Sequence, residues 1–149
     1  MRRKIAKIQT VNVRDLKVNE EFTPKPDPVF NHLLFEAVKG RTPVHFAVIA
    51  FQHLKRFDTT HRPELTVSGK QFVAQIIGAW QDGQPWPMWV YPSDDKFIAS
   101  DDYFTFAACE QERLDYVPCY VLGTPDQERV EHLRGPLMVE QIKKSLGFD

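Results

Sequence analysis

Residues 84–123 carry three strand-like segments and one helix-like segment at short intervals. The segments 86–91 and 96–100 are rich in aromatic and β-branched residues, and the turn-forming residues PSDD lie between them. This pattern predicts a β-hairpin. Asp101 is a candidate N-cap for a helix that follows, and residues 117–122 predict a third strand. The order predicts an α/β (α+β) domain with a small mixed sheet flanked by helices.

Two helices are predicted before this stretch. The first begins at Asp27-Pro28, because proline is favoured at the first helical position, and it ends at Gly40. The second begins at Ser68, which forms a capping box with Gln71, and it ends at Asp82-Gly83. The β-branched and aromatic run 44–51 between the two helices predicts a strand.

The two ends of the chain are predicted to extend this core. Residues 7–13 alternate weakly and predict an opening strand, and the prolines of TPKPDP predict an extended arm. Thr124 to Gln127 form another capping box, so two helical pieces separated by Gly135-Pro136 are expected. The chain is therefore predicted to be one domain, with an N-terminal strand and arm, a core and C-terminal helices at 1–28, 56–123 and 124–149.

Composition narrows the class of protein. The chain has 149 residues, of which 42% are hydrophobic and 26% are charged, as in a typical soluble globular domain. The formal net charge of -1 gives no overall attraction to nucleic acid or acidic lipid. No apolar run approaches the roughly 20 residues that span a bilayer, and the N-terminus lacks the apolar region of a secretion signal. A cytoplasmic protein without a membrane partner, with Cys109 and Cys119 reduced, is expected.

From about Arg56 to Gly123 the chain resembles the ParB/sulfiredoxin superfamily. The resemblance rests on the order of a helix ending near Trp80, the strands PMWVYP and KFIAS, a helix containing AACEQ, and the strand VPCYVLG. It implies the superfamily's small mixed sheet flanked by helices. It also implies activities that handle phosphate at the start of the last helix, namely nucleotide binding or hydrolysis, DNA cleavage, or repair of an oxidised cysteine.

The superfamily's diagnostic motif, G-x-[HR]-R-x-x-A, is not met. When its alanine is aligned with Ala108, its glycine falls on Asp102 and its basic pair on Phe104 and Thr105. Glycine and basic residues serve a phosphate because they admit close backbone amides and neutralise charge. Here Asp101 and Asp102 would repel a phosphate instead. The resemblance therefore implies a relative that keeps the scaffold without the phosphate site.

Four carboxylates support an enzyme hypothesis. In it the predicted hairpin brings Asp94 and Asp95 towards Asp101 and Asp102, which could hold Mg or Mn. Tyr103, Phe104 and Thr105 would then contact a ligand, giving a nucleotide- or nucleic-acid-processing enzyme with a modified phosphate site. The alternative is that the first pair forms a turn and the second pair caps a helix, with no metal and no cofactor.

Aromatic residues are concentrated around the predicted hairpin and its flanking helices. Successive strand residues face opposite sides, so we expect some of these rings to be exposed as anchors of a protein interface. The alternative is a hairpin buried on both faces. The interface candidates are Trp86, Trp89, Tyr91, Tyr103 and Phe106.

Basic residues interleaved with aromatic ones before the Ser68 helix suggest a weaker hypothesis of contact with single-stranded nucleic acid. The alternative is a solvated loop. The residues concerned are His53, Lys55, Arg56, His61 and Arg62. The two cysteines are expected to be buried and inert, and the histidines have no zinc-like spacing.

The sequence thus favours a non-catalytic ParB/sulfiredoxin-like domain that binds a protein partner or assembles with itself. The enzyme with a metal-assisted phosphate site is the alternative, and nucleic-acid binding ranks below both.

Overall fold

The computed structural model describes residues 25–84, 86–125 and 130–134. The predicted strand over 7–13 lies outside the described residues. The described elements, in chain order, are α2 (Pro28–Val38), β1 (Val44–Ala50), the short 3-10 helix η2 (Phe51–His53), β2 (Leu54–Arg56), the 3-10 helix η3 (Pro63–Leu65), α3 (Val67–Gln81), β3 (Met88–Ser93), β4 (Lys96–Ala99), α4 (Tyr103–Gln111), β5 (Tyr116–Leu122) and β6 (Val130–Arg134).

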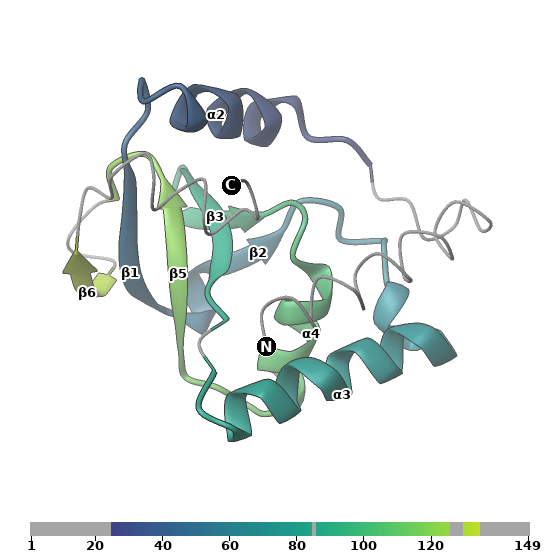
Figure 1. Ribbon diagram of the computed structural model, residues 1–149. Helices are drawn as coiled ribbons and strands as arrows, with labels where there is room; N and C mark the ends of the chain where they lie inside the picture. The colour runs from purple at the N-terminus through teal and green to yellow at the C-terminus, as the bar shows by residue number, and fades with distance from the viewer. Residues whose placement is uncertain (1–24, 85, 126–129, 135–149) are drawn as a thin grey trace.

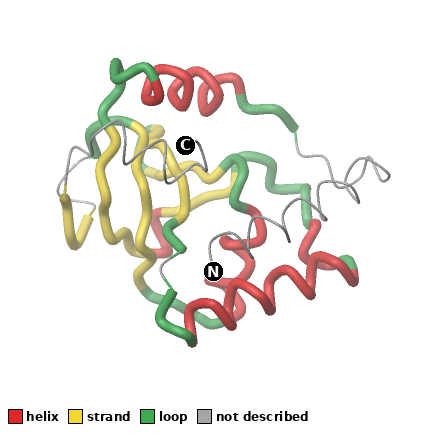
Figure 2. Tube along the Cα trace, viewed as in Figure 1, coloured by secondary structure: helices red, strands yellow, loops and turns green. Residues whose placement is uncertain are grey.

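These strands form one six-stranded sheet in the order β2-β4-β3-β5-β1-β6. The pairs β1–β5, β1–β6 and β3–β4 are antiparallel, whereas β2–β4 and β3–β5 are parallel. The α2 helix covers one face of the sheet, and α3 and α4 lie on the other side (Figures 1 and 2). The predicted α/β architecture with a small mixed sheet flanked by helices is confirmed.

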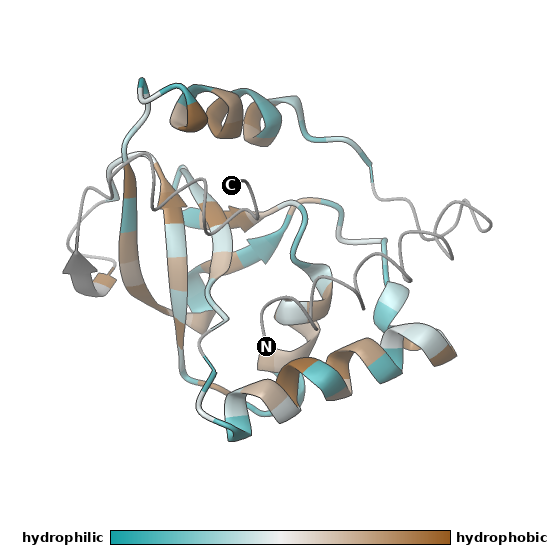
Figure 3. Cartoon of the chain, viewed as in Figure 1, coloured by the Kyte–Doolittle hydropathy of each residue, from teal (hydrophilic) through white to brown (hydrophobic). Residues whose placement is uncertain are grey.

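The central strands are buried on both faces. Along β3, Met88 and Val90 belong to the cluster under α4, while Trp89 and Tyr91 belong to the cluster under α2. This division follows from the two-residue period of a strand. Figure 3 shows the apolar residues along the strands and on the helices that cover them. The hairpin therefore takes the two-sided buried form that the sequence left open.

A third apolar cluster joins α3 to α4. Its centre is formed by Phe72, Ile76 and Ala108, and the Phe104 ring stacks on the Phe72 ring with centroids 4.8 Å apart. The predicted apolar stripe of the second helix thus packs on the last helix of the predicted core. This packing holds α3 against α4.

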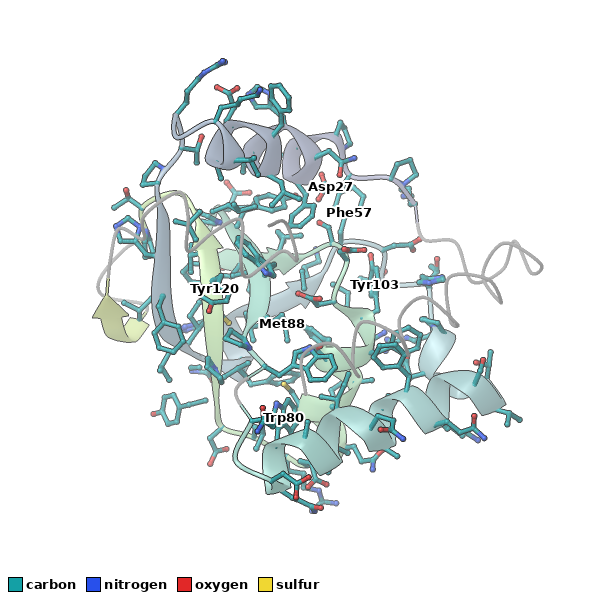
Figure 4. The ribbon with its side chains drawn as sticks, in the orientation of Figure 1. Asp27, Phe57, Trp80, Met88, Tyr103 and Tyr120 are labelled. Carbon is teal, nitrogen blue, oxygen red and sulfur yellow. The ribbon has the colours of Figure 1, made fainter. Side chains whose placement is uncertain are left out.

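Asp27 joins α2 to the strands beneath it. Its Oδ1 caps the helix by accepting hydrogen bonds from the amides of Val29 and Phe30, at 3.0 and 3.3 Å. Its Oδ2 accepts hydrogen bonds from the hydroxyl of Tyr91, at 2.6 Å, and from that of Ser100. The buried carboxylate therefore has four donors, which offset the cost of removing its charge from water. Figure 4 shows the Asp27 side chain beside the start of α2.

The local signals placed most boundaries correctly. The helix from Pro28 is confirmed, with Gly40 at a φ of 77° just after it, and the strands near 44–51, 86–100 and 117–122 are confirmed with shifts of one or two residues. Two caps were predicted wrongly. The N-cap of α3 is Thr66 rather than Ser68, and that of α4 is Asp102 rather than Asp101.

The C-terminal prediction was wrong in part. Residues 130–134, expected to be helical, form the strand β6, because they pair with β1 along the sheet. The residues 126–129 and 135–149 lie outside the described part of the chain. The strand β2 was not predicted, because a segment of three residues is too short for the alternation of a strand to be recognised. Among the described residues, no helix has the length and apolar character needed to cross a membrane.

Replacing Asp27 by Ala should lower the free energy of unfolding by about 3–5 kcal/mol, because it removes a helix cap and leaves two buried hydroxyls without their acceptor. Urea unfolding followed by circular dichroism measures the change. Asp95→Ala, in the exposed β3–β4 turn, is the control and should change stability by less than about 0.5 kcal/mol. Equal losses in the two variants would show that Asp27 does not hold α2 on the sheet.

Candidate functional site

The start of α4 offers little surface to a ligand. Asp101 is exposed and Asp102 is partly exposed, whereas Tyr103 and Thr105 are buried and Phe104 packs on α3. The hydroxyl of Tyr103 accepts a hydrogen bond from the amide of Asp58 at 2.9 Å. Tyr103 and Thr105 form part of the packing between α4 and its neighbours, and the prediction that they contact a ligand stays a prediction.

Asp102 has an unusual electrostatic environment. Its Oδ2 accepts a hydrogen bond from the backbone amide of Trp89 at 2.7 Å. Burial, and then the negative charge of Asp101, raise the pKa of Asp102 from 3.8 to about 7, although the Trp89 hydrogen bond acts in the opposite direction. The carboxyl group can therefore gain or lose a proton near neutral pH.

The four carboxylates of the enzyme hypothesis do not converge. Asp94 and Asp95 form the turn between β3 and β4, with Asp94 at a φ of 53°, and Asp101 and Asp102 follow the other end of β4. Four strand residues span about 13 Å. Within residues 25–84, 86–125 and 130–134, no group of three or more metal-ligating side chains is present. The expectation that the hairpin brings the two pairs together is wrong.

The predicted aromatic anchors are mostly buried. Trp89, Tyr91, Tyr103 and Phe106 all belong to the core, and Trp86 is partly buried with its ring 6.4 Å from that of Phe72. Figure 4 shows the Tyr103 side chain at the start of α4, inside the molecule. The expectation that these rings are exposed is wrong for the four core residues, because the sheet is covered on both faces.

The basic segment does not form a cationic surface. Lys55 and Arg62 are exposed and His53 is partly exposed, but Arg56 and His61 are buried. The five residues of the nucleic-acid hypothesis therefore do not share one surface, and contact with nucleic acid stays a prediction. Arg56 and His61 instead make contacts inside the molecule. The His61 ring packs edge-on against the Tyr103 ring, with the ring centres 5.2 Å apart.

Arg56 holds three elements together. Its guanidinium forms a bidentate pair with Glu64 of η3, at 3.0 and 2.8 Å, and binds Glu110 of α4 at 2.9 Å. The same group lies 5.0 Å from the centre of the Phe106 ring. Burial alone would raise the pKa of Glu64, but its hydrogen bond and charge interaction with Arg56 lower it overall. Arg56 thus fixes η3 against β2 and α4.

This anchoring positions a sharp corner between η3 and α3, which we define as residues 62–70. Thr66 is its centre: the side-chain oxygen accepts a hydrogen bond from the Gly69 amide at 3.0 Å and donates one to the Pro63 carbonyl at 2.8 Å. A Cβ atom on Gly69 would lie 1.9 Å from that carbonyl oxygen. Glycine is required there because the η3 backbone contacts the first turn of α3 directly.

Two large apolar side chains project from this corner. Leu65 is 67% exposed and Val67 is 76% exposed, on either side of the Thr66 cap. A leucine just before an N-cap commonly packs on an apolar residue in the first turn, but the corresponding residue here is Lys70. Sequence reasoning missed this surface, although the lack of an apolar residue at that position was a usable signal.

The cysteines lie in the core, as expected. Cys109 and Cys119 are both fully buried and free. Burial, followed by the charge of Glu110, raises the pKa of Cys109 to about 12, and burial raises that of Cys119 well above its ordinary value. Both thiols are therefore protonated at neutral pH, which disfavours nucleophilic or redox chemistry at either.

Comparison with known proteins does not assign this site. No protein-family model matches the sequence, and no curated protein matches it significantly.

Gly69→Ala should destabilise the protein by about 2 kcal/mol or more, because the new methyl group collides with the Pro63 carbonyl. Gly78→Ala in the same helix is the matched control. Its Cβ would meet nothing within 4 Å, so it should stabilise the protein by about 0.5–1 kcal/mol. Denaturant unfolding of both variants measures the difference. A neutral Gly69→Ala would mean that η3 does not rest on α3 as described.

Both thiols of the native protein should resist modification by a thiol reagent at pH 7.5, since they are buried and protonated. Labelling followed by mass spectrometry should show no adduct in native buffer and two adducts in denaturant. Rapid labelling of Cys109 in native buffer would contradict the packing of α4 on the sheet.

Proposed function

We propose that this chain is a non-catalytic module that binds a protein partner through the corner at residues 62–70. The observation that carries the proposal is the exposure of Leu65 and Val67 on a locked turn. Single apolar residues are common on protein surfaces. Leu65 and Val67 stand on either side of a rigid cap, so together they form an exposed apolar surface on a fixed part of the backbone.

The rigidity of the corner supports a binding role. Thr66, Gly69 and the Arg56–Glu64 pair fix the backbone that carries both apolar side chains. Binding on a preformed surface costs less conformational entropy than binding on a mobile loop. The neighbouring exposed side chains of Arg62 and Lys70 provide the polar rim that typically surrounds the apolar centre of an interface.

We also propose that the chain is a divergent relative of the ParB/sulfiredoxin superfamily. The succession of β3, β4, α4 and β5 supports this kinship, because it follows the order of elements in the resemblance. The carboxylates of Asp101 and Asp102 at the start of α4 favour the non-catalytic role, since they would repel a phosphate group there.

A photo-crosslinking amino acid at position 67 tests the proposed function in the cells that make the protein. We expect a discrete adduct, which should be lost when Leu65→Asp is added, because a charge would remove the apolar contact. An adduct of twice the 17.3 kDa chain mass would identify the partner as a second copy. Mass spectrometry identifies any other partner.

The matched control places the same crosslinker at Val29, which is 51% exposed on α2. It should give no discrete adduct, and Val29→Asp should leave the adduct from position 67 unchanged. Equal, diffuse crosslinking from both positions, or an adduct insensitive to Leu65→Asp, would refute the corner as the binding surface. The folded state of each variant is checked by circular dichroism.

A further inference from the structure

Each exposed apolar side chain of the corner has a cation one turn away from it. The Leu65 amide donates a hydrogen bond to the Arg62 carbonyl at 3.2 Å, so these two residues bound one turn of η3. Lys70 follows Val67 by three residues on α3, a spacing that makes two side chains neighbours on a helix. The Arg62 side chain is 44% exposed, and Lys70 is also exposed. The corner therefore presents two apolar side chains, each accompanied by a positive charge.

The carboxylates near the corner are already engaged. Glu64 binds the Arg56 guanidinium through both of its oxygens, at 3.0 and 2.8 Å, and Glu110 binds the same guanidinium at 2.9 Å. The Arg62 guanidinium lies farther from Glu64, at 3.6 Å, and the Glu64 side chain is only 14% exposed. With Lys70, these side chains comprise three cations and two carboxylates. One positive charge of the group is therefore left uncompensated, on its exposed side.

This combination of apolar and positive side chains selects a partner by charge. Lys or Arg opposite Arg62 and Lys70 would bring like charges together, which opposes binding. Asp or Glu at those positions would pair with the two cations at the rim of the contact. Leu65 and Val67 would then meet apolar side chains at its centre, which is the usual arrangement of a protein interface.

A protein fits this surface better than nucleic acid or a lipid membrane does. Phosphates and base edges offer no aliphatic contact to Leu65 and Val67, and the neighbouring basic residues Arg56 and His61 are buried. The formal net charge of -1 also gives the whole chain no attraction to a polyanion or to acidic lipid. The positive charge is local, and it matches a short acidic segment.

On the basis of the binding role proposed for the corner, we infer that the partner is another protein, which meets the corner with an acidic segment. Two apolar side chains of that segment contact Leu65 and Val67. Asp or Glu side chains on either side of them pair with Arg62 and Lys70. The corner therefore selects segments in which acidic residues flank a short apolar pair.

The test uses the full chain with the photo-crosslinking amino acid at position 67, irradiated in the cells that make the protein. Mass spectrometry sequences the crosslinked peptide of the partner. Within about four residues of the crosslink, or one helical turn, we expect more Asp and Glu than Lys and Arg. Arg62→Glu combined with Lys70→Glu should lower the adduct yield at least about fivefold, because like charges would then meet across the interface.

Lys39→Glu combined with Arg41→Glu is the matched control, since it makes the same change in net charge at exposed positions away from the corner. It should leave the adduct yield unchanged. Arg62→Lys combined with Lys70→Arg keeps both charges and should also retain the adduct. Replacing the two acidic residues of the partner nearest the crosslink by Lys should restore the adduct with the variant that carries Glu at 62 and 70. Circular dichroism checks that each variant is folded.

The possible results separate the acidic partner from the binding role itself. An adduct that Leu65→Asp abolishes but that Arg62→Glu with Lys70→Glu leaves unchanged would keep the corner as the binding surface and overturn the acidic partner. A crosslinked segment without an acidic excess, an adduct of twice the chain mass, or an adduct removed by nuclease would overturn it too. The occupant would then be a neutral or basic segment, a second copy or nucleic acid. The absence of any discrete adduct from position 67 would refute both proposals.

Discussion

The buried guanidinium of Arg56 is the interaction on which the α3 side of the molecule depends. It is 3% exposed, and a charge so far from water must be paired. Its two carboxylate partners come from η3 and α4, so the pairing joins β2, at the sheet edge, to both. Removing both partners would leave a buried charge uncompensated. The position of the Leu65–Val67 corner follows from this constraint, because η3 is held in place by Glu64.

Asp27 has the corresponding role on the opposite face of the sheet. Its four donors come from the first turn of α2 and from Tyr91 and Ser100. The start of the helix is therefore held by a buried carboxylate whose oxygens accept hydrogen bonds from both the helix and the sheet. Along the length of the helix, Phe30 and Ala37 make apolar contacts. A single polar anchor fixes the position of the helix, while the apolar contacts supply most of the favourable area.

The parts of the fold that sequence could predict are those with local causes. Asp27-Pro28 and Gly40 bound α2 through caps and backbone preference, and Asp94 takes the left-handed conformation that a tight turn needs. The role of Arg56 could not be predicted, because Glu110 is 54 residues away in sequence. The same limit explains why the burial of the aromatic rings could not be predicted. Trp89 and Tyr91 are interior residues because helices cover both faces of the sheet, and local sequence does not show that placement.

Asp102 has fewer partners than the other two side chains. Arg56 is bound by two carboxylates and Asp27 accepts hydrogen bonds from four donors, so each side chain has several partners. Asp102 accepts one hydrogen bond, from the Trp89 amide, and the removal of its carboxyl group from water, followed by the negative charge of Asp101, raises its pKa to about 7. A protein interior responds to pH where its charges are incompletely paired. In the described part of the chain, Asp102 at the junction between β3 and α4 is such a group.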